Sequence, residues 1–325
     1  MSRNKQKTKH ENQKAFAPGR GRKLSLAKLI LYVIIAAAVC YIAAALISTA
    51  WNNTITVAEY DLTADDLPGG LRIVMISDLH RKKFDETNQK LVNMTAEQKP
   101  DLIAVNGDML ERDYTDDELE ALASLLERLN KIAPVYFTAG NHDYCAFFTV
   151  IRQIAGNYLA GIEKSDALLR LEQTGAVFLE NEYRDVEING QKLRIGGFYG
   201  HATRMDYDTD DTWAERRDFL TEFCNTDSYK LMLSHRPDSF IHCTEKDDWD
   251  IDLILCGHTH NGIVSLPFGL GAIWTSEGFF PEHDRGEFTI GSHSKMLIFA
   301  GLAGGKNVPR VFNPPELGLI VIGQK

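Results

Sequence analysis

The stretch LRIVMISDLH, residues 71–80, joins an apolar run to a polar ending. Its first six residues are almost all aliphatic, which is typical of a strand buried on both faces. Asp78 and His80 follow at once, where the strand is expected to end. In open α/β folds, the loops after the carboxyl ends of strands carry the binding site. This stretch therefore predicts an α/β fold with a polar site at the edge of a sheet.

Apolar runs and amphipathic stretches alternate along the rest of the chain. Asn189-Gly190 is a hairpin signal, and Thr115 with Glu118 forms a capping box before an amphipathic helix. Strands are expected over 71–77, 102–106, 135–139, 177–180, 183–188, 192–198, 229–234 and 251–256, and near 263–266, 272–275, 296–300 and 318–322. Helices are expected over 85–98, 115–130, 146–173 (interrupted near Gly156 and Gly161) and 210–224. This mixture predicts two β-sheets with helices on their outer faces.

Composition and charge limit the functional classes. The 325 residues are 44% apolar and 25% charged, the balance of a globular protein with a core. Residues 1–50 carry nine Lys or Arg and one acid, which leaves 26 basic and 44 acidic residues, about −18, for 51–325. A surface this acidic repels nucleic acid, so no nucleic-acid partner is expected. The five cysteines show no CxxC spacing; unpaired thiols are favoured, and a Cys224–Cys243 bridge stays open.

An uncharged apolar run covers Leu29–Ala50, which is long enough to cross a bilayer. We expect a basic cytoplasmic tail over 1–23, a transmembrane signal-anchor helix over 24–50, a linker and lead-in over 51–70, and the main domain over 71–325. Basic residues precede the run, so the N-terminus is expected in the cytoplasm and the main domain outside a single-pass membrane anchor. A cleaved secretory signal is the alternative, with small residues near Ser48 and Ala50 as the cleavage site.

Five polar clusters each follow an apolar strand. Singly, each has an ordinary reading as a turn, a cap or a hydrogen-bonded loop, but five of the ten histidines fall within them. Two histidines two positions apart cannot share one helical face, which excludes the helical zinc-protease pattern. The clusters are Ser77-Asp78-Leu79-His80, Gly107-Asp108 with Glu111, Gly140-Asn141-His142-Asp143, Ser234-His235-Arg236-Pro237 and Gly257-His258-Thr259-His260.

This ordered set, D-x-H, G-D, G-N-H-D, H and G-H-x-H, resembles the calcineurin-like metallophosphoesterase superfamily over about residues 71–322. GHTHNGIVSLPF (257–268) resembles its bacterial membrane-associated branch, typified by YkuE and YaeI. The resemblance implies a four-layer αββα sandwich of two mixed β-sheets. Two departures are noted: Glu111 stands where many members have Asp, at a position that is not a ligand, and Asn261 stands where Gly is common.

The resemblance also implies the roles of the clustered residues. It assigns the first metal to Asp78, His80 and His260, the second to Asn141, His235 and His258, and the bridge between them to Asp108. It places His142 beside the metals as a catalytic residue. Asp143 is expected either to orient His142 or to cap its loop.

Two divalent cations suit this donor set. Mixed nitrogen and oxygen ligands favour Mn, Fe, Zn or Co over Ca, and manganese is the first expectation. Two cations about 3.5–4 Å apart polarise a phosphate ester and ionise a bound water, which then attacks in line. His142 is expected to protonate the leaving oxygen.

The sequence therefore predicts a membrane-anchored, monomeric phosphohydrolase. Its substrate would be a phosphorylated small molecule or lipid with a phosphodiester, phosphomonoester or pyrophosphate bond, as in lipid or envelope precursors. A nuclease of the same superfamily and a catalytically silent metal-dependent binding module are the alternatives. His201 and Arg236 are weaker candidates for lining the substrate pocket. The loop with Phe279-Phe280, His283 and Arg285 is a weaker candidate for contacting lipid or capping the substrate. Ordinary surface or packing roles are the alternatives for all of them.

Overall fold

The computed structural model describes residues 25–64, 67, 69–150, 153–154, 157–158, 162–202, 205, 209–243, 249–266, 274–275, 278–304 and 310–323. The chain divides into two compact units, Met1–Ala44 and Ala45–Lys325. Helix α1 (Leu26–Ala50) is followed by the 3₁₀ turn η1 (Trp51–Asn53). By length and composition, Leu26–Asn53 suffices to cross a bilayer, a criterion that a secretion signal near the N-terminus also meets. The expected tail, 1–23, lies outside the described residues.

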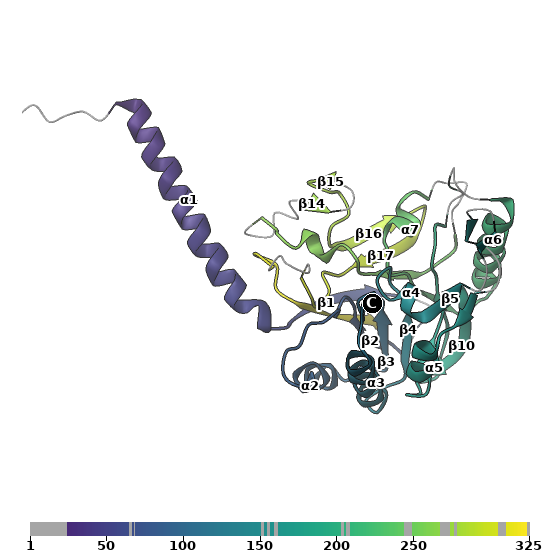
Figure 1. Cartoon of the computed structure of the whole chain (residues 1–325). Helices are drawn as coiled ribbons and strands as arrows, with labels where there is room; N and C mark the ends of the chain where they lie inside the picture. The colour runs from purple at the N-terminus through teal and green to yellow at the C-terminus, as the bar shows by residue number, and fades with distance from the viewer. Residues whose placement is uncertain are drawn as a thin grey trace, which may run out of the picture. The chain divides into compact units, whose positions relative to one another are not determined.

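Two six-stranded mixed sheets form the centre of the second unit, as far as the chain is described (Figure 1). The first sheet has the order β1 (Thr56–Thr63), β18 (Glu316–Gly323), β2 (Leu71–Ile76), β3 (Leu102–Asn106), β4 (Val135–Thr138), β9 (Val177–Phe178). The second has the order β10 (Glu182–Ile188), β11 (Gln191–Gly197), β12 (Tyr229–Leu233), β13 (Leu253–Cys256), β17 (Ser294–Ile298), β16 (Gly286–Ile290). Strands β2, β3 and β4 are parallel, as are β12 and β13, so their carboxyl ends reach one edge of each sheet.

Alternation along the strands builds four layers. In β2, Ile73 points into the core between the sheets, and Val74 points to the outer core. That outer core is covered by α2 (Gln89–Glu97), α3 (Asp116–Asn130) and α5 (Asp166–Glu172). Beyond the second sheet, α6 (Asp210–Cys224) and α7 (Asp238–Ile241) cover a third core. The expected αββα sandwich of two mixed sheets is confirmed.

Several expected elements differ in the structure. The helix predicted over 146–173 is wrong: α4 (Tyr144–Phe147) and α5 flank the short strands β5 (Phe148–Val150), β6 (Gln153–Ile154), β7 (Asn157–Tyr158) and β8 (Ile162–Lys164). The run Phe148–Val150 is aromatic and β-branched, which favours a strand. The strand predicted over 263–266 is reduced to one bridge at Val264. Of 272–275, only β14 (Trp274–Thr275), paired with β15 (Gly278–Phe279), is described.

Two strands of the six-stranded sheets were not predicted, and one helix begins later than expected. Strand β1 lies within the expected linker and lead-in over 51–70 and pairs in parallel with β18; β16 was also missed. Helix α2 begins at Gln89 rather than at residue 85. Asn88 has a φ of 57°, and the Asp85 carboxylate accepts the N–H of Gln89 at 2.8 Å and of Lys90 at 2.6 Å. Asp85 therefore caps the helix instead of entering it.

The capping box of α3 is formed as predicted. Thr115 Oγ1 accepts the Glu118 N–H at 3.3 Å, and Glu118 Oε2 accepts the Thr115 N–H at 2.8 Å. We expect Thr115→Ala to lower the free energy of unfolding by about 1 kcal/mol, because a helix N–H loses its acceptor. Urea unfolding measures the change, with Thr115→Ser as the control that keeps the hydroxyl. Equal destabilisation by both substitutions would contradict the capping role.

Candidate metal centre

The seven expected ligands all follow strand ends. Asp78 and His80 follow β2, Asp108 follows β3 and Asn141 follows β4; His235 follows β12, and the pair His258 and His260 follows β13. Buried Asn106 joins the two sheets at this edge, because its Nδ2 donates to the Leu255 carbonyl at 2.7 Å. The two sheets therefore bring ligands from five strands to one place.

Six of these residues form two groups of donor atoms. The donors of Asp78, His80 and His260 lie within 4.8 Å of one another, and so do those of Asp108, His235 and His258. Asp108 Oδ2 lies 3.2 Å from His235 Nε2 and 3.8 Å from His80 Nε2, so this carboxylate lies between the groups. The first group contains the residues expected to hold the first metal, and the second joins Asp108, the expected bridge, to His235 and His258 of the other expected set.

Asn141 reaches the same region. Its Oδ1 is buried and accepts no hydrogen bond from any described residue. The next N–H along the chain, that of His142, donates to Asp108 Oδ1 at 2.7 Å. His235 Nε2 is likewise buried and makes no well-directed hydrogen bond to a described residue, although Asp108 Oδ2 lies 3.2 Å from it. Buried polar atoms without partners are rare, and bound cations would give such atoms partners. The residues present therefore fit a metal centre.

Hydrogen bonds from the far side of two rings set their tautomers. His235 Nδ1 lies 2.8 Å from the Asn106 carbonyl, and His260 Nδ1 lies 3.0 Å from the Ala303 carbonyl. A carbonyl only accepts, so each Nδ1 carries the proton and each Nε2 keeps its lone pair. In each ring, Nε2 is therefore the nitrogen that is available to bind a cation.

The charges also favour cations. Burial lowers the pKa of His258 and of His260 to about 4, so both rings are neutral near pH 7. Burial acts to raise the pKa of Asp78 and of Asp108, yet the surrounding histidines outweigh it and lower both values. For His235, burial is outweighed by Asp108 and Asp78, which raise its pKa to about 10, so Nε2 has a lone pair for a cation only once its proton is displaced. The site therefore holds two buried carboxylates, whose charge divalent cations would neutralise.

Left-handed backbone recurs among the expected ligands. Positive φ values are found at Asp78 (54°), His80 (49°), Asp108 (51°), His258 (68°) and His260 (50°). Such angles are uncommon outside glycine and cost free energy, so they persist where the surrounding structure holds them. Each places a side chain at the strand end in a direction that a regular strand would not allow.

The sequence did not predict which carboxylate lies beside His142. His142 Nδ1 lies 2.9 Å from Glu111 Oε2, and His80 Nδ1 lies 3.2 Å from Glu111 Oε1. Asp143 instead accepts two backbone N–H groups, from Gly140 at 2.6 Å and from Met109 at 2.8 Å. Of its two expected roles, this geometry matches loop capping. The carboxylate facing the His142 ring is that of Glu111, whose spacing of three from Asp108 was the available signal.

Buried Arg310 was also missed. Its Nε donates to the Ala303 carbonyl at 2.8 Å, and its Nη2 donates to the carbonyls of Gly301 (3.0 Å) and Ala300. The Ala303 carbonyl also accepts from His260 Nδ1. Arg310 thus holds the loop that orients a ligand, and no motif marks it in the sequence.

The charged residues and histidines among the weaker candidates contact other parts of the protein. Arg236 pairs with Asp238 (Nε to Oδ1 2.9 Å), and Arg285 pairs with Glu316 at 2.6 Å. His201 Nδ1 lies 3.3 Å from the Asp238 carbonyl. His283 packs on Phe288, with ring centroids 5.0 Å apart. Phe279 and Phe280 are exposed. The thiol of Cys224 is free, so the Cys224–Cys243 bridge is not formed.

The Asp78 side chain occupies space that a side chain at position 301 would fill. A Cβ on Gly301, whose φ is +65°, would lie 2.5 Å from Asp78 Oδ2. We expect Gly301→Ala to weaken metal binding at least about tenfold, because displacing a ligand costs no less than losing one of its supporting contacts. Competition with a metal-binding dye measures the affinity. Gly323→Ala is the matched control, since a Cβ there meets nothing within 4 Å. Unchanged affinity in Gly301→Ala would show that Asp78 does not need this position.

Known proteins with similar sequences are metallophosphoesterases and a phosphodiesterase. Among similar proteins, "Uncharacterized metallophosphoesterase YkoQ" of Bacillus subtilis is 27% identical over 66% of this chain and 69% of its own length. "Uncharacterized metallophosphoesterase YkuE" of the same organism is 28% identical over 83% and 86%. "Phosphodiesterase YaeI" of Escherichia coli is 27% identical over 66% and 67%. Residues 71–262, which contain every expected ligand, match the sequence profile of the calcineurin-like phosphoesterases. The chain therefore belongs to the calcineurin-like phosphoesterase family and is a metal-dependent phosphoesterase.

Proposed function

We propose that this protein is a membrane-anchored phosphohydrolase with a dinuclear metal centre. The observation that carries the proposal is the pair of donor groups, one on Asp78, His80 and His260 and one on Asp108, His235 and His258. Asp108 lies within 3.8 Å of a histidine from each group, which suits a bridging ligand. When bound, two divalent cations would polarise the phosphate and supply an ionised water near neutral pH. Manganese is the first candidate, with Fe, Zn or Co as the others.

His142 is proposed as the proton donor to the leaving oxygen. Its side chain is partly exposed, beside the His80 ring at a centroid distance of 4.9 Å. Glu111 accepts from Nδ1, which leaves Nε2 as the ring nitrogen that faces a substrate. Asp143 is proposed to hold the loop on which His142 lies, through Gly140 and Met109.

The substrate is proposed to be a phosphodiester, phosphomonoester or pyrophosphate of a lipid or envelope precursor. An anchor over 24–50 would keep the domain over 71–325 at the membrane surface, outside the cytoplasm, as a monomer. The support is the uncharged run of α1 and the basic residues before it. The acidic surface of 51–325 disfavours a nuclease.

Asp108→Asn tests the metal centre. We expect loss of both metals and a fall in turnover of at least about a hundredfold, because the bridging charge is removed. Metal content by elemental analysis and hydrolysis of a panel of monoesters, diesters and pyrophosphates are the measurements. Asp185→Asn, at a carboxylate paired with Arg194, is the control and should behave as wild type.

His142→Ala separates catalysis from metal binding. It should keep its metals and lose about 10²–10⁴-fold in kcat.

Full activity of Asp108→Asn would overturn the proposed site. Metal-loaded wild type that hydrolyses nothing on the panel would favour the silent binding module.

Membrane topology is tested in intact cells. We expect added protease to degrade residues 51–325 while an epitope tag at the N-terminus survives, since the basic tail stays in the cytoplasm. Immunoblots before and after lysis provide the measurement. Release of 51–325 into the medium would point to a cleaved signal, and protection of both ends to a cytoplasmic domain.

A further inference from the structure

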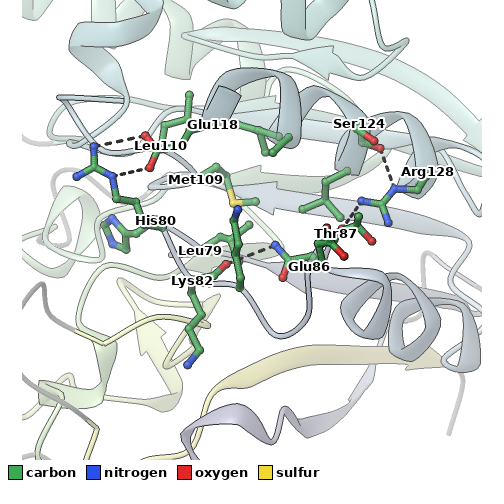
Figure 2. A pocket seen from close by; sticks show the side chains of 16 residues that line it. Leu79, His80, Lys82, Glu86, Thr87, Met109, Leu110, Glu118, Ser124 and Arg128 are labelled. Atoms are coloured by element: carbon green, nitrogen blue, oxygen red, sulfur yellow. Dashed lines mark hydrogen bonds and ion pairs between the residues drawn. The ribbon is translucent and has the colours of Figure 1, made fainter. Parts of the chain in front are cut away.

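A cavity of about 140 Å³ lies between the loop over 79–88 and helix α3. Figure 2 shows His80 at one end of it and Arg128 at the other. His80 is also a member of the first donor group. The cavity and the proposed metal centre therefore share one side chain.

Five buried apolar side chains line one part of this cavity. Leu79 lies between two expected ligands in the sequence, and Met109 directly follows Asp108. The same strand-end turns thus send their polar residues to the metal centre and their apolar residues to the cavity. The buried apolar lining is Leu79, Met109, Leu110, Leu122 and Leu125.

Mostly polar and charged side chains line the rest, and among the charged ones cations outnumber acids. Arg81 is held by Glu118 at 2.8 Å, and Arg128 is held by the Thr87 carbonyl at 2.6 Å. Lysines at 82 and 83 add two cations, and Glu86 adds one acid. A cationic rim beside apolar side chains suits an amphiphile whose anionic head lies next to the cavity.

The rim is tied to the segment that follows the apolar helix. Lys82 Nζ donates to Asn53 Oδ1 at 2.8 Å, and Lys90 Nζ donates to the Asn53 carbonyl at 2.8 Å. Trp51, in the same 3₁₀ turn, is exposed. Aromatic side chains of this kind favour the interface between bilayer and water. Both contacts lie within the unit Ala45–Lys325, so they hold the wall of the cavity next to the membrane-proximal segment.

We propose that this cavity binds the hydrocarbon chain of a phosphate ester whose phosphate lies at the metal centre. This inference rests on the proposed phosphohydrolase function. Engineered apolar cavities of about 150 Å³ bind benzene, so the cavity has room for about six carbons. Because His80 borders both places, the chain must begin next to the phosphate. The ligand is therefore an alkyl or prenyl phosphate rather than an ester whose phosphate is separated from its chain by a sugar or nucleoside.

Binding of alkylphosphonates tests the chain-length dependence without turnover. The full chain, in nanodiscs of zwitterionic lipid with Mn²⁺, is titrated calorimetrically with phosphonates of two, four, six and eight carbons. We expect affinity to rise about fourfold per methylene up to about six carbons and then to level off, as the cavity fills. A flat series would overturn the proposal.

Two variants of α3 locate the effect. Ala121 is exposed on this helix and lines the cavity, so Ala121→Trp fills it from the surface; thermal unfolding checks that the variant is folded. We expect Ala121→Trp to lose the rise with chain length. Lys131→Trp, exposed at the C-cap of the same helix, should keep it. Partition of longer chains into the nanodisc is the same for all three proteins. A rise preserved in folded Ala121→Trp would place the chain elsewhere.

Parallel hydrolysis of ethyl and hexyl phosphate separates the two proposals. Turnover of both esters with equal kcat/KM and a flat phosphonate series would reject the cavity and leave the phosphohydrolase standing. A steep phosphonate series with no turnover of either ester, in any of the four metals, would reject the phosphohydrolase and leave the binding site. The expected result is a higher kcat/KM for hexyl phosphate that Ala121→Trp removes.

Discussion

The buried junction at Asn106 sets where everything at the sheet edge lies. Its side-chain amide donates to the Leu255 carbonyl of β13, and its own carbonyl accepts from His235 Nδ1 at the end of β12. Asn106 is the last residue of β3, so one residue links the carboxyl end of the first sheet to two strands of the second. A packed apolar core between the sheets would allow some sliding, whereas directed hydrogen bonds between buried groups fix one alignment. The expected ligands, which follow five different strands, can meet because this alignment is fixed.

The sequence predicted those parts of the structure that depend on local patterns. Apolar runs located most strands of both sheets, and the capping box located α3. The polar clusters at strand ends identified the six residues that the structure gathers into two donor groups. They could be read because parallel strands bring their ends together, whatever the connections between them.

Features that depend on contacts across the chain were not predictable in this way. Strand β1 is recognisable chiefly through its pairing with β18, some 260 positions later. Arg310 reads as an ordinary surface residue, and only the fold buries it against three carbonyls beside Asp78. The carboxylate beside the His142 ring is that of Glu111 and not that of Asp143, which sequence alone could not decide, because side-chain direction after a strand end depends on φ values. The helix predicted over 146–173 was wrong because the apolar residues of this stretch include β-branched and aromatic ones, which favour strands.

The left-handed backbone at five of the expected ligands has a consequence for the stability of the folded protein without bound metal. Each such residue holds free energy that the rest of the fold must offset, and two buried carboxylates repel each other at the same place. Cations bound there would stabilise the folded chain in proportion to their concentration and affinity. Metal availability in the compartment where the domain folds would then act as a quality check. Chains that fail to acquire metal would be the ones most readily opened and degraded, so the working population would be selected for loaded sites.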